Sequence, residues 1–115
     1  MLRENEDLAG AMEHFCRLLA GQEFFEAHEV LEEAWHPLRR RKDPRRHPVK
    51  GLINAAIALE HLKRGRPKSL RVAGRAFAAY ERRCSRPWPL EEGLSTGYDR
   101  CREAVARARM KWFPD

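Results

Sequence analysis

The sequence contains no apolar run that approaches the roughly 18 residues of a membrane-spanning helix. Its first ten residues, MLRENEDLAG, are acidic and lack the apolar stretch of a secretory signal. The three cysteines, Cys16, Cys84 and Cys101, are widely spaced and form no Cys-x-x-Cys pair, which argues against a disulfide framework and a thiolate zinc site. We therefore expect a soluble, cytoplasmic protein whose cysteines are small buried side chains.

The sequence also lacks strand-like alternation, internal repeats and a linker long enough to separate two domains. Five stretches instead carry apolar residues at helical spacing. The second is predicted to run from Phe24 to His36 and to end at Pro37, with a loop up to Pro48. The third, residues 49–65, is apolar almost all round and belongs at the centre of the fold. We predict one all-α domain over residues 1–115, a compact array of about five helices.

Charge is unevenly distributed along the chain, whose formal net charge is +6. Residues 1–36 contain two basic and nine acidic side chains, whereas residues 37–115 contain 21 basic and eight acidic ones. Such a dipolar chain could steer anionic partners to one face or self-associate head to tail into a homo-oligomer. The predicted loop concentrates six basic residues that could grip the phosphates of a nucleic acid: Arg39, Arg40, Arg41, Lys42, Arg45 and Arg46. We favour a solvated loop instead, because no aromatic or glycine pattern accompanies these charges.

The segment FFEAHEVLEEAW places two ionisable residues among bulky apolar ones on one helix. At about 100° per residue, His28 and Glu32 fall between Trp35 on one side and Phe25 on the other, whereas the other glutamates of the segment fall on the opposite, solvated face. A buried carboxylate needs a partner, and His28 lies one turn earlier. The pair is consistent with a hydrogen bond that fixes the helix in the core, or with two ligands of one divalent metal ion. Trp35 itself is predicted to be a core anchor.

This segment also resembles the signature of a known family. Residues 25–35, FEAHEVLEEAW, are similar to the motif of domain-of-unknown-function family 309, which comprises small helical bacterial and archaeal proteins. A second block of that family is similar to residues 50–54 (KGLIN), His61 and residues 63–65 here, so the resemblance runs from about Gly21 to Phe77. It implies a compact all-α fold and a metal-binding role for His28 and Glu32, but no established activity.

The third predicted helix carries one polar stripe, which consists of Lys50, Asn54 and His61. If this stripe faces His28 and Glu32, the two helices enclose a polar cluster of the kind in which helical bundles place ligand and metal sites. His36 and His61 are both candidates for a third metal ligand, and the family resemblance favours His61. The family has glutamine at the positions of Lys50 and Asn54, and a lysine beside a bound cation would repel it.

These observations predict a metal or small-ligand site between the second and third helices and specify no reaction. The proposed ligands are His28, Glu32 and His61, and the supporting residues are Asn54, Trp35 and Lys50. Neither a nucleophile constellation nor a phosphate-binding glycine loop is visible in the sequence. The alternative is a binding module that uses the basic residues at positions 39–46 against an anionic partner, with His28 and Glu32 as a core pair.

Overall fold

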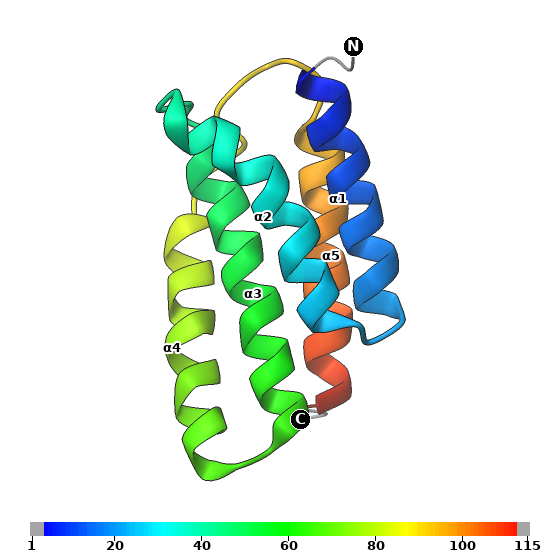
Figure 1. The fold of residues 1–115 in the computed structure, drawn as a ribbon, viewed down its shortest axis with the longest axis vertical. Helices are drawn as coiled ribbons and strands as arrows, with labels where there is room; N and C mark the ends of the chain where they lie inside the picture. The colour runs from blue at the N-terminus through cyan, green and yellow to red at the C-terminus, as the bar shows by residue number, and fades with distance from the viewer. Residues whose placement is uncertain (1–3, 113–115) are drawn as a thin grey trace.

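The computed structural model describes the backbone of residues 4–112 and the side chains of residues 7–111. It confirms the prediction of an all-α fold (Figure 1), with five helices and no strand in the part described. The helices are α1 (Glu4–Ala20), α2 (Phe24–Arg40), α3 (Arg46–Arg64), α4 (Pro67–Arg83) and α5 (Ser95–Trp112). Within these residues, no helix combines the length and apolarity needed to cross a membrane.

Helix α3 lies at the centre of the bundle, as its apolar sequence predicts. It packs against α2, α4 and α5, while α1 completes the array by packing against α2 and α5 (Figure 1). Ten residues of α3 are buried, among them Leu52, Ile53 and Leu59, which are fully inaccessible to solvent. Burial of apolar side chains on several faces of one helix is what holds the other four helices around it.

The predicted boundaries of the second and third helices are wrong. Helix α2 continues through Pro37 to Arg40, and α3 begins at Arg46, so the connection contains only residues 41–45. Pro37 removes one backbone hydrogen bond, but the next residue, Leu38, is 1% exposed, and its burial stabilises the last turn of α2. Pro48 lies in the first turn of α3, where a missing N–H costs little.

Helices α3 and α4 approach each other closely at Gly51. A Cβ atom at this position would lie 2.5 Å from Sγ of Cys84 and 3.0 Å from Cβ of Arg83. Cys84 is buried, and its thiol donates a hydrogen bond to the carbonyl oxygen of Pro48 over 3.5 Å. The absence of a side chain at Gly51 therefore allows the close spacing of the two helices. Separately, burial raises the pKa of the Cys84 thiol.

Candidate functional site

The His28–Glu32 pair lies on α2 beside α3. Nε2 of His28 is 3.5 Å from Oε2 of Glu32, and the two side chains are 18% and 38% exposed. The Glu32 side chain is thus more exposed than the sequence predicts. Glu32 follows the buried Leu31 by one position and so lies at the edge of the packed face, and Phe25, which was expected to cover it, is itself exposed.

A backbone contact fixes the orientation of the His28 ring. Nδ1 of His28 lies 2.8 Å from the carbonyl oxygen of Phe25, which can only accept a hydrogen bond. Nδ1 must therefore carry the proton, and in the neutral ring the lone pair resides on Nε2, the atom that faces Glu32. Two electron-rich atoms 3.5 Å apart are stabilised by a proton or a cation between them.

His28 and His61 line the same small cavity between α2 and α3. Its volume is about 120 Å³, and its wall also includes Phe24, Phe25, Ile57, Glu60 and Arg64. Nδ1 of His61 is buried and has no hydrogen-bond partner among the described residues. A polar atom without a partner is costly unless water or a ligand satisfies it, so His61 carries an unused hydrogen-bonding atom.

Asn54 lies two helical turns before His61 on the same face of α3. Its Oδ1 atom is likewise buried without a partner among residues 7–111. Asn54 and His61 therefore supply two unsatisfied polar atoms on the central helix, whose remaining buried residues are almost all apolar. Buried polar atoms of this kind are usually satisfied by an ordered water, and Asn54 itself does not line the cavity.

Trp35 and Lys50 form the other end of the α2–α3 contact. The indole Nε1 of Trp35 donates a hydrogen bond to the carbonyl oxygen of Arg46 over 3.1 Å, and the ring packs against the core. Nζ of Lys50 lies 4.4 Å from the centroid of this ring, which is cation–π geometry. Lys50 thus directs its charge at the face of Trp35.

A comparison with protein families tests the resemblance seen in the sequence. The model of the family described as "Domain of unknown function (DUF309)" matches residues 12–72, just over half of the 115 residues. The chain belongs to the DUF309 family. The match starts earlier and ends earlier than the range of about 21–77 that the motifs indicate, and it covers α2, α3 and parts of α1 and α4. Neither the curated proteins nor the solved structures gave a match.

The sequence led us to expect a metal at His28 and Glu32, and the geometry of these two residues bears on that expectation. A histidine that ligates a metal typically donates its other ring N–H to a carbonyl or carboxylate, as His28 does to Phe25. Protein zinc centres use three or four side chains. Among the described residues, no three His, Cys, Asp or Glu side chains converge on one point. His28 and Glu32 alone thus offer fewer protein ligands than such a centre has.

The six basic residues at positions 39–46 do not form the open loop that the sequence predicts. Arg45 is buried, 5% exposed, because its guanidinium pairs with Asp43 over 2.7 Å and with Glu92 over 3.2 Å. The hydrogen bonds from Arg45 hold the pKa of Asp43 at about 2. Of the remaining five, three contact neighbouring groups: Arg39 lies over the Trp35 ring, Arg41 pairs with Asp43, and Arg46 donates to the Asp43 carbonyl.

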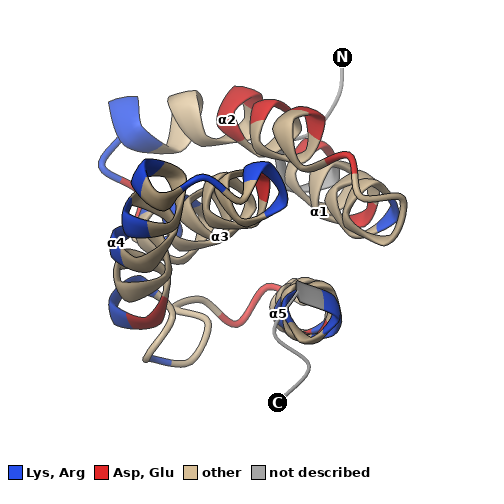
Figure 2. Cartoon of the chain, turned by 90° about the horizontal axis from the view of Figure 1, so that it is seen from below, with Lys and Arg blue, Asp and Glu red and all other residues tan. Residues whose placement is uncertain are grey.

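Positive charge nevertheless gathers away from the His28–Glu32 pair. Figure 2 shows basic residues at the C-terminal end of α2 and along α4, whereas acidic residues mark the N-terminal part of α2. The separation follows the uneven charge of the sequence itself, in which nine of the acidic side chains precede position 37.

Sequence reasoning missed a pair of thiols on two other helices. Cys16 of α1 and Cys101 of α5 have Sγ atoms 3.7 Å apart. Each cysteine falls on the apolar stripe of its helix, so the sequence places both toward the interior. Their proximity depends on the register of α1 against α5, which helical periodicity does not define.

Proposed function

We propose that His28 and Glu32 hold a divalent cation at the edge of the cavity between α2 and α3, whose wall includes His28 but not Glu32, and that a small molecule binds in the cavity through this cation. The observation that carries this proposal is the hydrogen bond from Nδ1 of His28 to the Phe25 carbonyl, which leaves the Nε2 lone pair facing the Glu32 carboxylate. When bound, the cation supplies a positive centre to which an oxygen or nitrogen atom of the small molecule can attach.

The other residues of the site act on the small molecule. His61 lines the cavity from α3, and its buried Nδ1 can donate or accept a hydrogen bond. Asn54 offers a carbonyl oxygen on the same face of α3 and orients the ligand or a water that contacts it. We also propose a cytoplasmic location, which the three free cysteines support, since reducing conditions keep thiols free.

Metal binding by tag-free protein tests the proposal directly. We expect zinc, manganese or iron(II) to bind with one ion per chain in equilibrium dialysis, and His28→Ala and Glu32→Ala each to weaken binding by at least about tenfold. The matched controls are His47→Ala and Glu29→Ala, which change exposed residues of the same types. Equal affinity in His28→Ala and wild type, with both folded by circular dichroism, would overturn the assignment.

The tautomer of His28 gives a second, independent readout. In the neutral ring we expect nitrogen NMR to show the proton on Nδ1, and addition of the cation to shift Nε2 alone. A proton on Nε2 of the neutral ring would remove the observation on which the proposal rests. His61→Ala should retain the cation, because His61 is assigned to the small molecule and not to the metal.

A further inference from the structure

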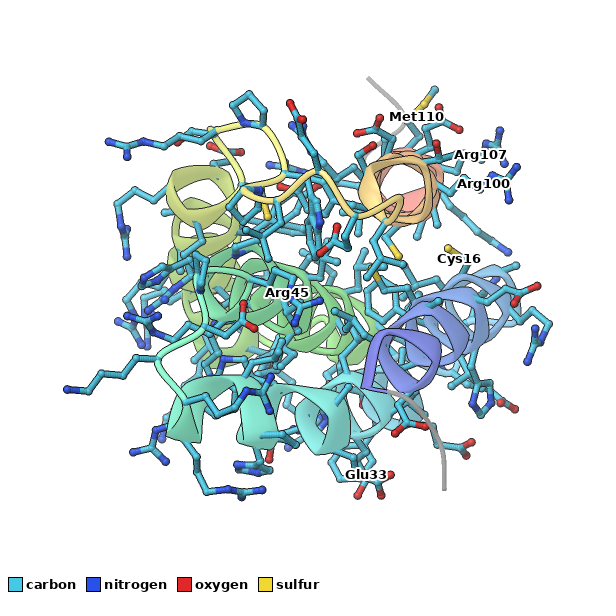
Figure 3. All side chains as sticks on the ribbon, turned by 90° about the horizontal axis from the view of Figure 1, so that it is seen from above. Cys16, Glu33, Arg45, Arg100, Arg107 and Met110 are labelled. Carbon is cyan, nitrogen blue, oxygen red and sulfur yellow. The ribbon has the colours of Figure 1, made fainter. Side chains whose placement is uncertain are left out.

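A second and larger cavity lies between α1 and α5. Its volume is about 780 Å³, within the usual range for small-molecule sites. Apolar side chains of Met12, Leu19, Phe24 and Ala104 form part of its wall, and Cys16 is also exposed to it. Figure 3 shows Cys16 in the space between α1 and α5, with Arg100 and Arg107 on the same side of α5.

The second thiol lies next to the cavity wall. Cys101 does not line the cavity, is fully buried, and has its Sγ 3.7 Å from that of Cys16 and 3.5 Å from the carbonyl oxygen of Met12. The two thiols differ in access, because Cys16 is half-buried and open to the cavity. This is the arrangement of an accessible attacking thiol with a protected partner behind it.

The surroundings of Cys16 favour its reactive form. Its hydrogen bond with Cys101 and the charge of Arg100 lower the pKa of Cys16 to about 7, against the opposing effects of burial and of Glu13 and Glu103. The hydrogen bond with Cys16 and burial raise the pKa of Cys101. Cys16 is therefore the more readily ionised of the two thiols, and Cys101 the one that keeps its proton.

We infer that Cys16 and Cys101 form a dithiol site that reacts with hydroperoxides admitted through the α1–α5 cavity. The Cys16 thiolate attacks one oxygen of the peroxide, the O–O bond breaks, and the second oxygen leaves with a proton as water or an alcohol. The product is a sulfenic acid on Cys16. The Cys101 thiol then attacks the Cys16 sulfur, a disulfide forms, and the hydroxyl leaves with the Cys101 proton as water.

Overall, one peroxide is reduced by two electrons and the two thiols are oxidised by two electrons. The sulfur atoms must approach by about 1.7 Å to reach bonding distance. The cavity beside them leaves room for this movement of α1 against α5. Three basic side chains of the wall, Arg100, Arg107 and Lys111, outnumber its two acidic ones, Glu13 and Glu103. With the apolar residues they suit an organic hydroperoxide that carries a carboxylate.

Titration of the reduced protein with hydrogen peroxide, and in parallel with a long-chain fatty-acid hydroperoxide, tests the inference. We expect either oxidant to lower the mass of the intact chain by two hydrogens, peptide mapping to find a Cys16–Cys101 disulfide, and dithiothreitol to reverse it. The reaction should be faster than that of free cysteine at pH 7, because the pKa of the Cys16 thiol is lowered. A faster reaction with the fatty-acid hydroperoxide would identify the organic class, and a faster reaction with hydrogen peroxide the inorganic one.

Cysteine variants make the outcome decisive. Cys16→Ser should abolish the disulfide, whereas Cys101→Ser should stop the reaction at a sulfenic acid that dimedone traps on Cys16. Cys84→Ser is the matched control, because Cys84 is buried against α3, and it should oxidise like wild type. If Cys101→Ser does not fold, Cys101→Ala serves in its place. Disulfide-linked dimers as the main product, or a rate no faster than free cysteine, would overturn the inference.

Discussion

The ammonium group of Lys50 lies 4.4 Å from the centroid of the Trp35 ring. Lys50 stands where the family pattern has glutamine. From the sequence, its positive charge is expected to repel a cation bound at His28 and Glu32. The structure directs its charge to an aromatic face instead, and the same indole donates to the carbonyl of Arg46 at the start of α3. The departure from the family pattern therefore stabilises the contact between α2 and α3.

Replacing Lys50 by the glutamine of the family tests this role. Lys50→Gln should lower the free energy of unfolding by about 0.5–1 kcal/mol, the usual strength of such a contact, measured by urea denaturation. Affinity for the divalent cation should change by less than about twofold, because the charge acts on Trp35. A tenfold increase in that affinity would show instead that Lys50 repels the bound ion.

Two glycines provide a matched test of helix packing. Gly51→Ala should destabilise the protein by about 1–3 kcal/mol, because the new Cβ meets the Cys84 sulfur and α3 and α4 must separate. Gly74→Ala adds a Cβ on α4 that meets nothing within 4 Å, and should stabilise by up to about 1 kcal/mol. Thermal or urea unfolding of both variants measures the difference. Equal effects would contradict the close approach at Gly51.

The Asp43–Arg45 contact predicts a loss of stability in acid. The pKa of Asp43 is about 2 in the folded protein and has an ordinary value of 3.8, so the unfolded chain binds a proton first as the pH falls. About 2 kcal/mol of stability is fully present above pH 4 and is lost as the pH falls from about 4 to 2. Urea unfolding between about pH 4 and pH 2 should show this fall in the free energy of unfolding. In Asp43→Asn, the part of the fall that is due to Asp43 should be absent. An unchanged profile in Asp43→Asn would disprove the assignment.

Arg45 should be far more sensitive to substitution than its basic neighbours. Arg45→Met leaves the carboxylates of Asp43 and Glu92 without their partner, and should destabilise by about 3 kcal/mol or more. Arg40→Met changes an exposed residue and should alter the free energy of unfolding by less than about 0.5 kcal/mol. Chemical denaturation compares the two variants. A small effect at Arg45 would mean that the buried contact contributes little.

Helical periodicity predicted the fold class, the number of helices and the central place of α3, because apolar spacing reports which residues face the core. It failed at Pro37 and at the basic residues that follow. Proline and charge indicate a solvated loop locally, but burial of Leu38 extends α2 past Pro37. Within the short connection, Arg45 is buried by its pairing with Glu92, 47 residues away. Contacts between residues far apart in sequence also explain why the Cys16–Cys101 pair was not foreseen.

The placement of His28 relative to Glu32 follows from four-residue spacing on one helix, so the sequence could supply it. The exposure of Glu32 could not be derived in the same way, since it depends on how α2 is rotated against α3. The tautomer of His28 likewise depends on a backbone contact that becomes visible only once the ring conformation is known.

The Glu92 side chain links the connection before α3 to the connection before α5. It accepts hydrogen bonds from Arg45, which precedes α3, and from the indole of Trp88, whose ring packs against Tyr98 near the start of α5. Helix α5 is thereby anchored where it begins, although the large cavity borders the helix along its length, from Thr96 to Lys111. Native-state hydrogen exchange should consequently be graded along α5: amides near Tyr98 should be the last to exchange, and protection should fall toward the C-terminal turns.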